Sequence, residues 1–257
     1  MASQDHDRRL TVPGPGTTHA HKLGAERDLY APVIGITNLR VDEADGRLKI
    51  VHPASANIAR DTIGRHARGD RAEHTALIYE DEAEQLTRYT FAELDTLSDR
   101  LAVALAARGV TRGEPVAVQT GQTPETAIAH MAIYKLGAVV LTLSQLYGPD
   151  TVEHVLNDSE ARVLITERRT WDELGPARDR FRTLEHAILR GGAAGSGAAA
   201  FDDCLEQGRD GAAALVPVET GADDPALLMY TSGSTGMPKG MLHAHRILHA
   251  YLPSVTM

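Results

Sequence analysis

Cysteine, basic excess charge and long apolar runs are all scarce in this sequence, and each shortage excludes a class of protein. Cys204 is the only cysteine, which excludes an internal disulfide framework and a zinc site with several cysteines, and predicts a cytoplasmic location. Lys and Arg total 26 against 35 Asp and Glu, whereas nucleic-acid binders usually carry a basic excess. The longest strongly apolar run, residues 138–141, is far too short to cross a membrane. We therefore expect no nucleic-acid partner and no membrane span.

The apolar fraction of the chain, by contrast, is that of a folded protein. Hydrophobic residues make up 42% of the 257 positions, which is enough for a full core at this length. The first 30 residues are polar, and we interpret them, with His6, His19 and His21, as a loosely ordered lead-in rather than a metal site. We divide the chain into a polar extension, residues 1–48, and a folded domain, residues 49–257.

A helix is predicted to begin after Thr90. Thr90 and Glu93 have the spacing of a capping box, in which a hydroxyl and a carboxylate each accept a hydrogen bond from a free backbone N–H. Gly109 supplies a left-handed stop. Between them, leucines recur every three or four residues and so share one face of a helix: Leu94, Leu97, Leu101 and Leu105.

Strands and helices then alternate along the chain. Strands are predicted over residues 115–119, 139–143, 161–166 and 186–189, with helices over 124–136 and 150–157. Strands joined through helices form parallel sheets, because each crossover returns the chain in the same direction. The predicted fold class is α/β, with a doubly wound, mostly parallel sheet and helices on both faces.

A Gly/Ala-rich stretch over residues 191–200 contains Gly195-x-Gly197-x-x-Ala200, which has the form of a dinucleotide fingerprint. The residues that follow do not predict a long amphipathic helix, which that fingerprint requires. We therefore interpret the stretch as a flexible surface loop.

The segment with the most chemical content begins at Ala226. Residues 226–230 are predicted to form a buried strand, which runs into ten residues rich in glycine and hydroxyl groups and ending in Pro238-Lys239-Gly240. Glycines let backbone N–H groups approach a phosphate closely. Hydroxyls can donate hydrogen bonds to phosphate oxygens, and Lys239 adds a point charge. This composition favours a loop that wraps a polyphosphate.

Three other motifs fail on spacing. A nucleoside-triphosphatase P-loop needs Gly directly before the lysine, where Pro238 stands. A serine-hydrolase elbow needs Gly two residues before the serine. That position holds Tyr230 for Ser232, and Ser232 for Ser234. A Ser-x-x-Lys pair is absent as well, because Gly236 stands three residues before Lys239.

Over Tyr230–Gly240 the sequence resembles the signature loop of the AMP-forming adenylating enzymes, which include acyl-CoA synthetases, peptide-synthetase adenylation domains and beetle luciferases. Tyr89–Leu94 is similar to an early helix-starting motif of that superfamily, and Tyr134–Ala138 to its helix-to-strand turn. Residues 146–150 and 240–246 resemble the acyl-CoA synthetase branch. The resemblance begins near Ile50 and covers only the N-terminal part of such enzymes.

The resemblance implies a two-step ligase reaction. A carboxylic acid attacks the α-phosphate of ATP to give an acyl-adenylate and pyrophosphate, and coenzyme A then takes the acyl group, as in fatty acid metabolism. Lys239 would be the catalytic phosphate contact, and Mg²⁺ would be bound by a residue outside this sequence, so no metal ligand is assigned here. The implied contacts to the β- and γ-phosphates are Thr231, Ser232, Gly233, Ser234, Thr235, Gly236 and Lys239.

Four reactive side chains near the loop are weaker candidates. His243, His245 and His249 are predicted to lie on a helix over residues 241–252, but Arg246 stands where a zinc protease carries glutamate beside its first histidine. A place near the acyl site, or ordinary packing, stays open for these histidines. Cys204 has acidic neighbours, which would raise the pKa of its thiol and disfavour a nucleophilic role.

The sequence ends at Met257, before the magnesium-binding glutamate, the ribose-binding aspartate and the C-terminal catalytic lysine that the family resemblance leads us to expect. We therefore expect the N-terminal part of a longer synthetase, completed by a missing C-terminal part or a partner chain, and no acyl-CoA formation by residues 1–257 alone. The alternative is a non-catalytic remnant, or half of a split enzyme, that binds a phosphate-containing ligand or a partner chain. Coding sequence beyond Met257 would distinguish the two.

Overall fold

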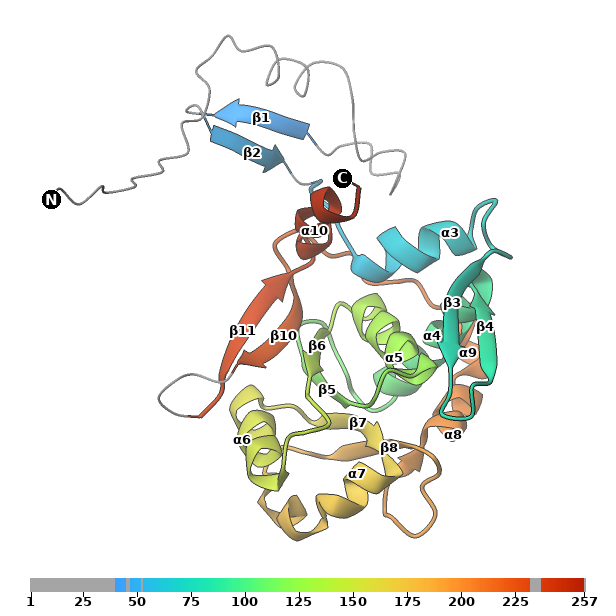
Figure 1. The fold of residues 1–257 in the computed structure, drawn as a ribbon, viewed down its shortest axis with the longest axis vertical. Coiled ribbons are helices and arrows are strands. Elements are labelled where there is room, and N and C mark those ends of the chain that lie inside the picture. Colours follow the sequence, from blue (N-terminus) through green and yellow to red (C-terminus); the bar gives the residue numbers. More distant parts are fainter. Residues whose placement is uncertain (1–39, 45–46, 52, 232–236, 257) are drawn as a thin grey trace, which may run out of the picture. The chain divides into compact units, whose positions relative to one another are not determined.

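A computed structural model describes residues 40–44, 47–51, 53–231 and 237–256 (Figure 1). The chain divides into two compact units, residues 1–53 and 54–255. In the first unit, β1 (Arg40–Ala44) and β2 (Arg47–Val51) form an antiparallel hairpin. Residues 1–30, with the three histidines of the expected lead-in, lie outside the described residues. The domain boundary expected at residues 48 and 49 stays a prediction.

The second unit is built around a seven-stranded sheet. Its strands run in the order β11-β10-β6-β5-β7-β8-β9, and every neighbouring pair is parallel except β10 and β11. The predicted α/β fold with a mostly parallel sheet is therefore confirmed. The strands are β5 (Pro115–Gln119), β6 (Val139–Thr142), β7 (Val163–Glu167), β8 (His186–Arg190), β9 (Ala199–Ala200), β10 (Pro225–Thr231) and β11 (Lys239–Ala244).

Helices cover both faces of this sheet (Figure 1). Helices α4 (Phe91–Ala106) and α5 (Pro124–Lys135) share one core with Val116 and Val118 of β5. On the other face, α6 (Pro149–Ser159), α7 (Arg168–Glu173) and the 3₁₀ turn η2 (Gly175–Arg180) share a second core with Ala117. Successive residues of a strand point to opposite faces. Burial on both faces explains why the central strands have nearly continuous apolar sequences.

The ends of the helices follow the signals in the sequence. The Thr90 hydroxyl accepts a hydrogen bond from the Glu93 N–H (3.1 Å), and the Glu93 carboxylate accepts one from the Thr90 N–H (2.8 Å), so the capping box is confirmed. Gly109 adopts the expected left-handed conformation, with φ +81°. After α5, Gly137 has φ +63°, and a Cβ there would lie 3.1 Å from Val218. That turn therefore requires glycine both for its backbone conformation and for space.

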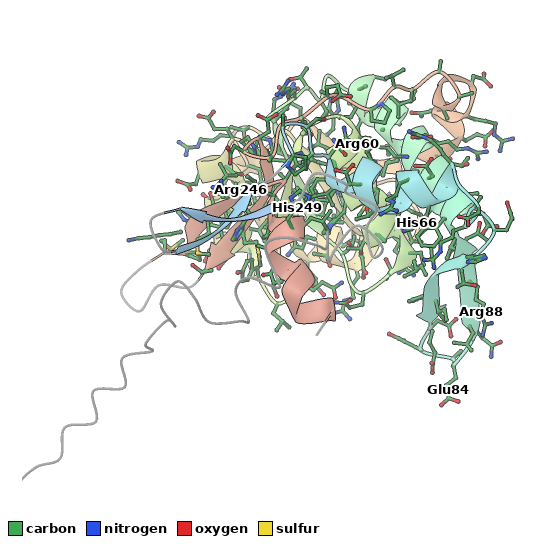
Figure 2. The ribbon with its side chains drawn as sticks, turned by 90° about the horizontal axis from the view of Figure 1, so that it is seen from above. Arg60, His66, Glu84, Arg88, Arg246 and His249 are labelled. Carbon is green, nitrogen blue, oxygen red and sulfur yellow. The ribbon has the colours of Figure 1, made fainter. Side chains whose placement is uncertain are left out.

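Several short elements were not predicted from the sequence. Before α4 lie a π-helical turn η1 (Arg60–Gly64), α3 (Arg65–Ala67) and a hairpin of β3 (Thr75–Glu80) with β4 (Leu86–Thr90). Glu84 and Arg88 lie toward the tip of that hairpin in Figure 2. The Gly/Ala-rich stretch ends in β9, and α8 (Phe201–Gln207) and α9 (Arg209–Ala212) follow it. Within the described residues, no helix is both long and apolar enough to cross a membrane.

The helix predicted over residues 241–252 is wrong over residues 241–244 and confirmed from Ile247 onward. Residues 239–244 form β11, antiparallel to β10 with Lys239 opposite Thr231, and helix α10 (Ile247–Thr256) begins later. β6 pairs with one edge of β10 only, so the chain returning from the loop forms backbone hydrogen bonds along the other edge. The strand predicted over 226–230 is present, but Met229 is 41% exposed, because β10 lies next to the edge of the sheet.

A buried lysine connects helices α4 and α5. Lys135 is 1% exposed. Its ammonium donates to the carbonyl of Asp95 (2.8 Å) and to the carboxylates of Asp95 (2.7 Å) and Asp99 (2.6 Å), both on α4. Burial raises the pKa of the Asp99 carboxyl, while the Lys135 ammonium acts in the opposite direction. The lysine of the predicted helix-to-strand turn therefore forms structural ion pairs inside the core.

The backbone of the same turn joins three more segments. The Asn57 side-chain amide donates to the Tyr134 carbonyl (2.7 Å), the Val218 N–H to the Lys135 carbonyl (2.7 Å), and the Gly113 N–H to the Gly137 carbonyl (2.8 Å). Carbonyls at the end of a helix lack partners within the helix. Here segments far apart in the sequence supply those partners, and the start of β6 is held in place.

We expect Lys135→Met to destabilise the protein by about 3–5 kcal/mol, because two inward-facing carboxylates lose their cation while the side-chain volume changes little. Urea unfolding at pH 7 measures the change. The matched control is Arg169→Met, because the Arg169–Glu173 ion pair (3.2 Å) is on the surface, with the arginine side chain 86% exposed. Its loss should cost less than about 1 kcal/mol. Equal losses in the two variants would contradict this role for Lys135.

Candidate functional site

The predicted phosphate loop joins β10 to β11. Thr231 ends β10, Lys239 begins β11, and the two residues pair across the hairpin. Both are exposed, so a hydroxyl and an ammonium flank the loop on its two sides. The other predicted site residues lie outside the described residues: Ser232, Gly233, Ser234, Thr235 and Gly236.

The loop lies at the edge of the sheet where ligands bind in this class of fold. Leu227–Met229 of β10 pairs in parallel with Val140–Thr142 of β6. The loop therefore follows the carboxyl end of β10, at the edge where β5, β6 and β7 also end. In open α/β sheets, ligands bind outside the carboxyl ends of the strands. A loop of phosphate-binding composition thus follows the strand at this edge, and its phosphate contacts stay a prediction.

Lys239 offers a positive charge at this edge. It has no ion-pair partner within the part of the chain that the structure describes. Arg246, which lies beyond the other end of β11, by contrast pairs with Asp223 (2.6 Å). An ammonium without a carboxylate partner can contact a phosphate oxygen without first breaking an ion pair.

Three hydrogen bonds connect the hairpin to α6 and to the residues just before it. The Tyr230 hydroxyl donates to the Asp158 carboxylate (2.6 Å), and the Tyr147 hydroxyl donates to the Tyr230 carbonyl (3.2 Å). His154 Nε2 lies 3.0 Å from the Pro238 carbonyl oxygen, to which it donates. Burial, reinforced by Asp158, raises the pKa of the Tyr230 phenol, so the phenol stays protonated as a donor.

The sequence analysis missed these residues, although one signal was available. His154 and Asp158 are four residues apart and so share one face of α6. They lie beside the buried apolar stripe of this helix, which includes Val152 and Val155. A polar pair at helical spacing next to a buried stripe indicates that those side chains meet a neighbouring element.

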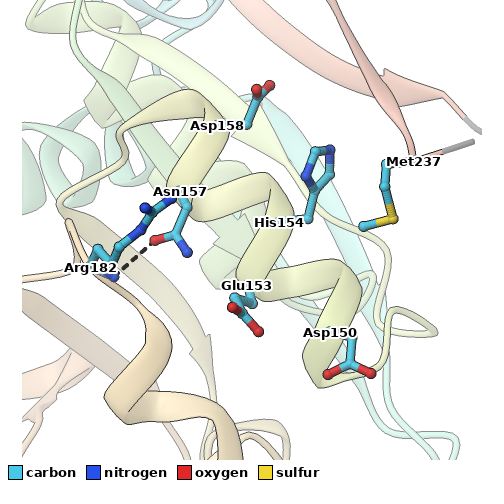
Figure 3. Close-up of a pocket in the computed structure, with 7 residues that line it drawn as sticks. All are labelled: Asp150, Glu153, His154, Asn157, Asp158, Arg182 and Met237. Atoms are coloured by element: carbon cyan, nitrogen blue, oxygen red, sulfur yellow. Dashed lines mark hydrogen bonds between the residues drawn. The ribbon is translucent and has the colours of Figure 1, made fainter.

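A cavity of about 540 Å³ opens along α6 beside the hairpin (Figure 3). Carboxylates dominate its polar lining, and two of them, Asp150 and Glu153, pair with Arg180 (2.8 Å and 2.9 Å). Carboxylates repel a polyphosphate, so the cavity does not suit one, whereas the exposed Thr231 and Lys239 do. The cavity is lined by Asp150, Glu153, His154, Asn157, Asp158, Arg182 and Met237.

The three histidines after the loop come from three different parts of the fold. His243 lies on β11, His245 in the turn that follows, and His249 on α10. His245 is 1% exposed, and its Nδ1 accepts a hydrogen bond from the Ile58 N–H (3.2 Å). Burial lowers the pKa of His245 to about 4. No cluster of three or more His, Cys, Asp or Glu side chains that could hold a metal ion occurs in the described residues.

Cys204, the remaining reactive side chain, is buried in α8. Burial raises the pKa of its thiol, and Asp203 acts in the same direction while Arg108 opposes it. A buried thiol that stays protonated is a poor nucleophile.

A mostly parallel sheet with helices on both faces, and a glycine- and hydroxyl-rich sequence after the carboxyl end of β10, define an α/β protein. Residues 64–256 match the family described as AMP-binding enzyme, and the chain belongs to that family. The resemblance to AMP-forming adenylating enzymes is therefore confirmed.

Curated relatives include acetyl-coenzyme A synthetases. The one from Shewanella amazonensis is 31% identical over 241 residues, covering 88% of this chain and 36% of the relative. The one from Magnetococcus marinus is 32% identical over 253 residues, covering 91% and 38%. A 3-hydroxybenzoate/4-hydroxybenzoate–CoA ligase from Thauera aromatica is 32% identical over 194 residues, covering 75% and 35%. The chain thus spans 35–38% of the lengths of these relatives.

Solved structures show the same fold. An anthranilate CoA ligase in complex with anthranoyl-AMP has a TM-score of 0.68 and 27% identity, covering 78% of this chain and 37% of that one. An acyl-CoA synthetase from Brucella canis has a TM-score of 0.69 at 23% identity, covering 90% and 39%, and supports the fold alone.

The buried His245 makes stability depend on pH. Its pKa is about 4 in the folded protein and about 6.5 in an unfolded chain, so between these values the unfolded state binds more protons. Stability contributed by neutral His245 is therefore lost as the pH falls from about 6.5 to 4, by up to about 3 kcal/mol. Burial lowers the pKa of His130 to about 4 as well, so it adds to the same loss.

We expect His245→Asn to reduce the pH dependence of the free energy of unfolding by the contribution of His245, leaving that of His130. The Asn Oδ1 can take the place of Nδ1 as acceptor for the Ile58 N–H, and the amide does not titrate. Urea unfolding at a series of pH values from 7 to 4 measures the slope, and His130 preserves part of it. An unchanged slope in the variant would show that the pKa of His245 is the same in the folded and the unfolded protein.

Proposed function

We propose that this chain is part of a ligase that activates a carboxylic acid with ATP and transfers the acyl group to coenzyme A. In the first step a carboxylate oxygen attacks the α-phosphorus, the bond from that phosphorus to the bridging oxygen breaks, and pyrophosphate leaves. In the second step the coenzyme A sulfur attacks the carbonyl carbon of the acyl-adenylate. AMP leaves, the thiol proton is released, and a thioester remains.

The position of Lys239 is the observation that carries this proposal. The lysine and Thr231 flank a loop with the composition of a phosphate-binding loop, at the sheet edge where ligands bind. There the ammonium of Lys239 would stabilise negative charge on the β- and γ-phosphates as pyrophosphate leaves. Hydroxyl and backbone N–H groups of residues 231–236 would donate hydrogen bonds to the same oxygens.

Mg²⁺ would further neutralise the phosphates when bound, and we assign none of its ligands to this chain. Thr231 and Lys239, at the two ends of the loop, suit the anion, whereas the carboxylates that line the neighbouring cavity do not. Lys239 is exposed and lacks an ion-pair partner among the described residues, and the Asp158 carboxylate is engaged by the Tyr230 hydroxyl.

The relatives support a carboxylic acid and coenzyme A as the other substrates. They include acetyl-coenzyme A synthetases and a hydroxybenzoate–CoA ligase, and one solved structure with this fold holds anthranoyl-AMP. Because the chain spans 35–38% of the lengths of the curated relatives, we propose the activity for the whole protein to which it belongs. The cytoplasm, where ATP and coenzyme A are available, is the proposed location.

We expect Lys239→Met to slow acid-dependent ATP–pyrophosphate exchange about 10- to 150-fold, because one charge-assisted hydrogen bond of about 1.5–3 kcal/mol is lost. Exchange is measured in the longest protein that the coding sequence encodes, with acetate, propionate, benzoate and the hydroxybenzoates as acids. The matched control is Arg246→Met, which removes an exposed cation that pairs with Asp223 and should leave exchange unchanged. Normal exchange in Lys239→Met would refute the assigned role of the lysine.

A further inference from the structure

The stem of the β10–β11 hairpin, defined here as residues 230–231 and 238–240, extends beyond the strand that supports it. β6 pairs with β10 at Leu227–Met229 only. From Tyr230 onward, the hairpin has no further strand beside it among the described residues. A two-stranded hairpin alone is only marginally stable in water. Side-chain contacts must therefore set the position of the stem.

Those contacts are distributed unequally between the two strands of the stem. Tyr230, on the outgoing strand, is held twice, by Asp158 and by Tyr147. The returning side of the stem has one such hydrogen bond in the described part of the chain, between His154 Nε2 and the Pro238 carbonyl (3.0 Å). Proline has no N–H, so this carbonyl is the only backbone hydrogen-bonding group that Pro238 offers. Lys239 follows it directly.

We propose that His154 is a positioning residue for the phosphate loop. Its Nε2–H holds the carbonyl of Pro238 and thereby fixes the direction in which the Lys239 ammonium leaves the sheet. The consequence for ATP rests on the proposed function, whereas the consequence for the stem rests on the geometry of the hairpin alone. His154 acts through the backbone of the loop and touches no substrate.

The N–H donor of His154 is the decisive group, and two substitutions isolate it. The His154 ring lies edge-on to the Tyr230 ring, with centroids 6.2 Å apart, which orients Nε2 toward Pro238. Glutamine places an amide N–H close to the position of Nε2. Leucine keeps much of the side-chain volume but has no donor. A role of simple space-filling would predict that leucine is tolerated at least as well as glutamine.

The experiment compares His154→Gln, His154→Leu and the matched control His74→Leu, which replaces an exposed histidine outside the site. Hydrogen–deuterium exchange of the peptide covering residues 229–241 reports on the stem without any nucleotide. The KM values for ATP and for the acid, measured by ATP–pyrophosphate exchange, report on the consequence for the reaction. Exchange in the β7 peptide, residues 163–167, shows whether the fold is intact.

We expect the stem peptide of His154→Leu to exchange its amide hydrogens for deuterium faster. We also expect the KM for ATP to rise by roughly 3- to 10-fold, the effect of losing one neutral hydrogen bond. The KM for the acid and the hydrogen–deuterium exchange of the β7 peptide should stay unchanged. His154→Gln and His74→Leu should resemble the unmodified protein in all of these measurements. Equal hydrogen–deuterium exchange of the stem peptide in His154→Leu and in the control would overturn the proposal. So would a His154→Gln variant whose stem exchange and KM for ATP rise as much as those of His154→Leu.

The two proposals fail in different ways. If the longest protein that the coding sequence encodes catalyses no ATP–pyrophosphate exchange in its unmodified form, while hydrogen–deuterium exchange of the stem still rises in His154→Leu and not in His154→Gln, the proposed function is wrong and the positioning role stands. If pyrophosphate exchange is present and the KM for ATP is the same in all three variants, the proposed function stands and His154 does not position the loop.

Discussion

The buried ammonium of Lys135 determines how the parts of this fold that carry the site are joined. Transfer of a charge into the interior is costly, and here it is offset by two carboxylates and a carbonyl on a neighbouring helix. The turn around it also receives hydrogen bonds from Asn57, Val218 and Gly113. The beginning of β6 is thereby fixed, and β6 in turn sets the position of β10. The place of the phosphate loop thus depends on an ion pair at the opposite end of β6.

Placement and orientation of the loop are separate tasks in this structure. Strand pairing between β10 and β6 places the loop at the ligand-binding edge, whereas side chains on and before α6 hold its two ends. The 257 residues carry a net charge of −9, which repels an anionic ligand. Under the proposed function, the exposed Lys239 would offset that repulsion locally, which would make the geometry of the hairpin stem more important than the total charge.

Local rules predicted the central strands and the capped helices well, because Thr90, Glu93 and Gly137 each impose a conformation through their immediate neighbours. The same rules could not predict β11. Its partner is reached only after the chain turns back, and the apolar spacing of residues 241–244 fits a strand or a helix. The partners of Lys135 and His154 could not be predicted either, because they come from distant segments, although the spacing of His154 and Asp158 indicated a contact with some neighbouring element. The loop motif was recognisable because its residue types, glycines, hydroxyls and a lysine, are those that a phosphate-binding loop requires. Only Thr231 and Lys239, at its ends, lie among the described residues.

The order of the strands has a consequence for how the protein is made. β10 pairs with β6, with Leu227 opposite Val140, so the whole of β7, β8 and α8 is synthesised between the two partners. A chain emerging from the ribosome can pair β5 with β6 and β7, and β7 with β8, before β10 exists. N-terminal regions generally fold first during synthesis. Pairing between such distant segments is also intrinsically slow. The edge of β6 therefore stays unpaired until β10 has been synthesised, and β10 and β11 join the sheet after β5, β6, β7 and β8.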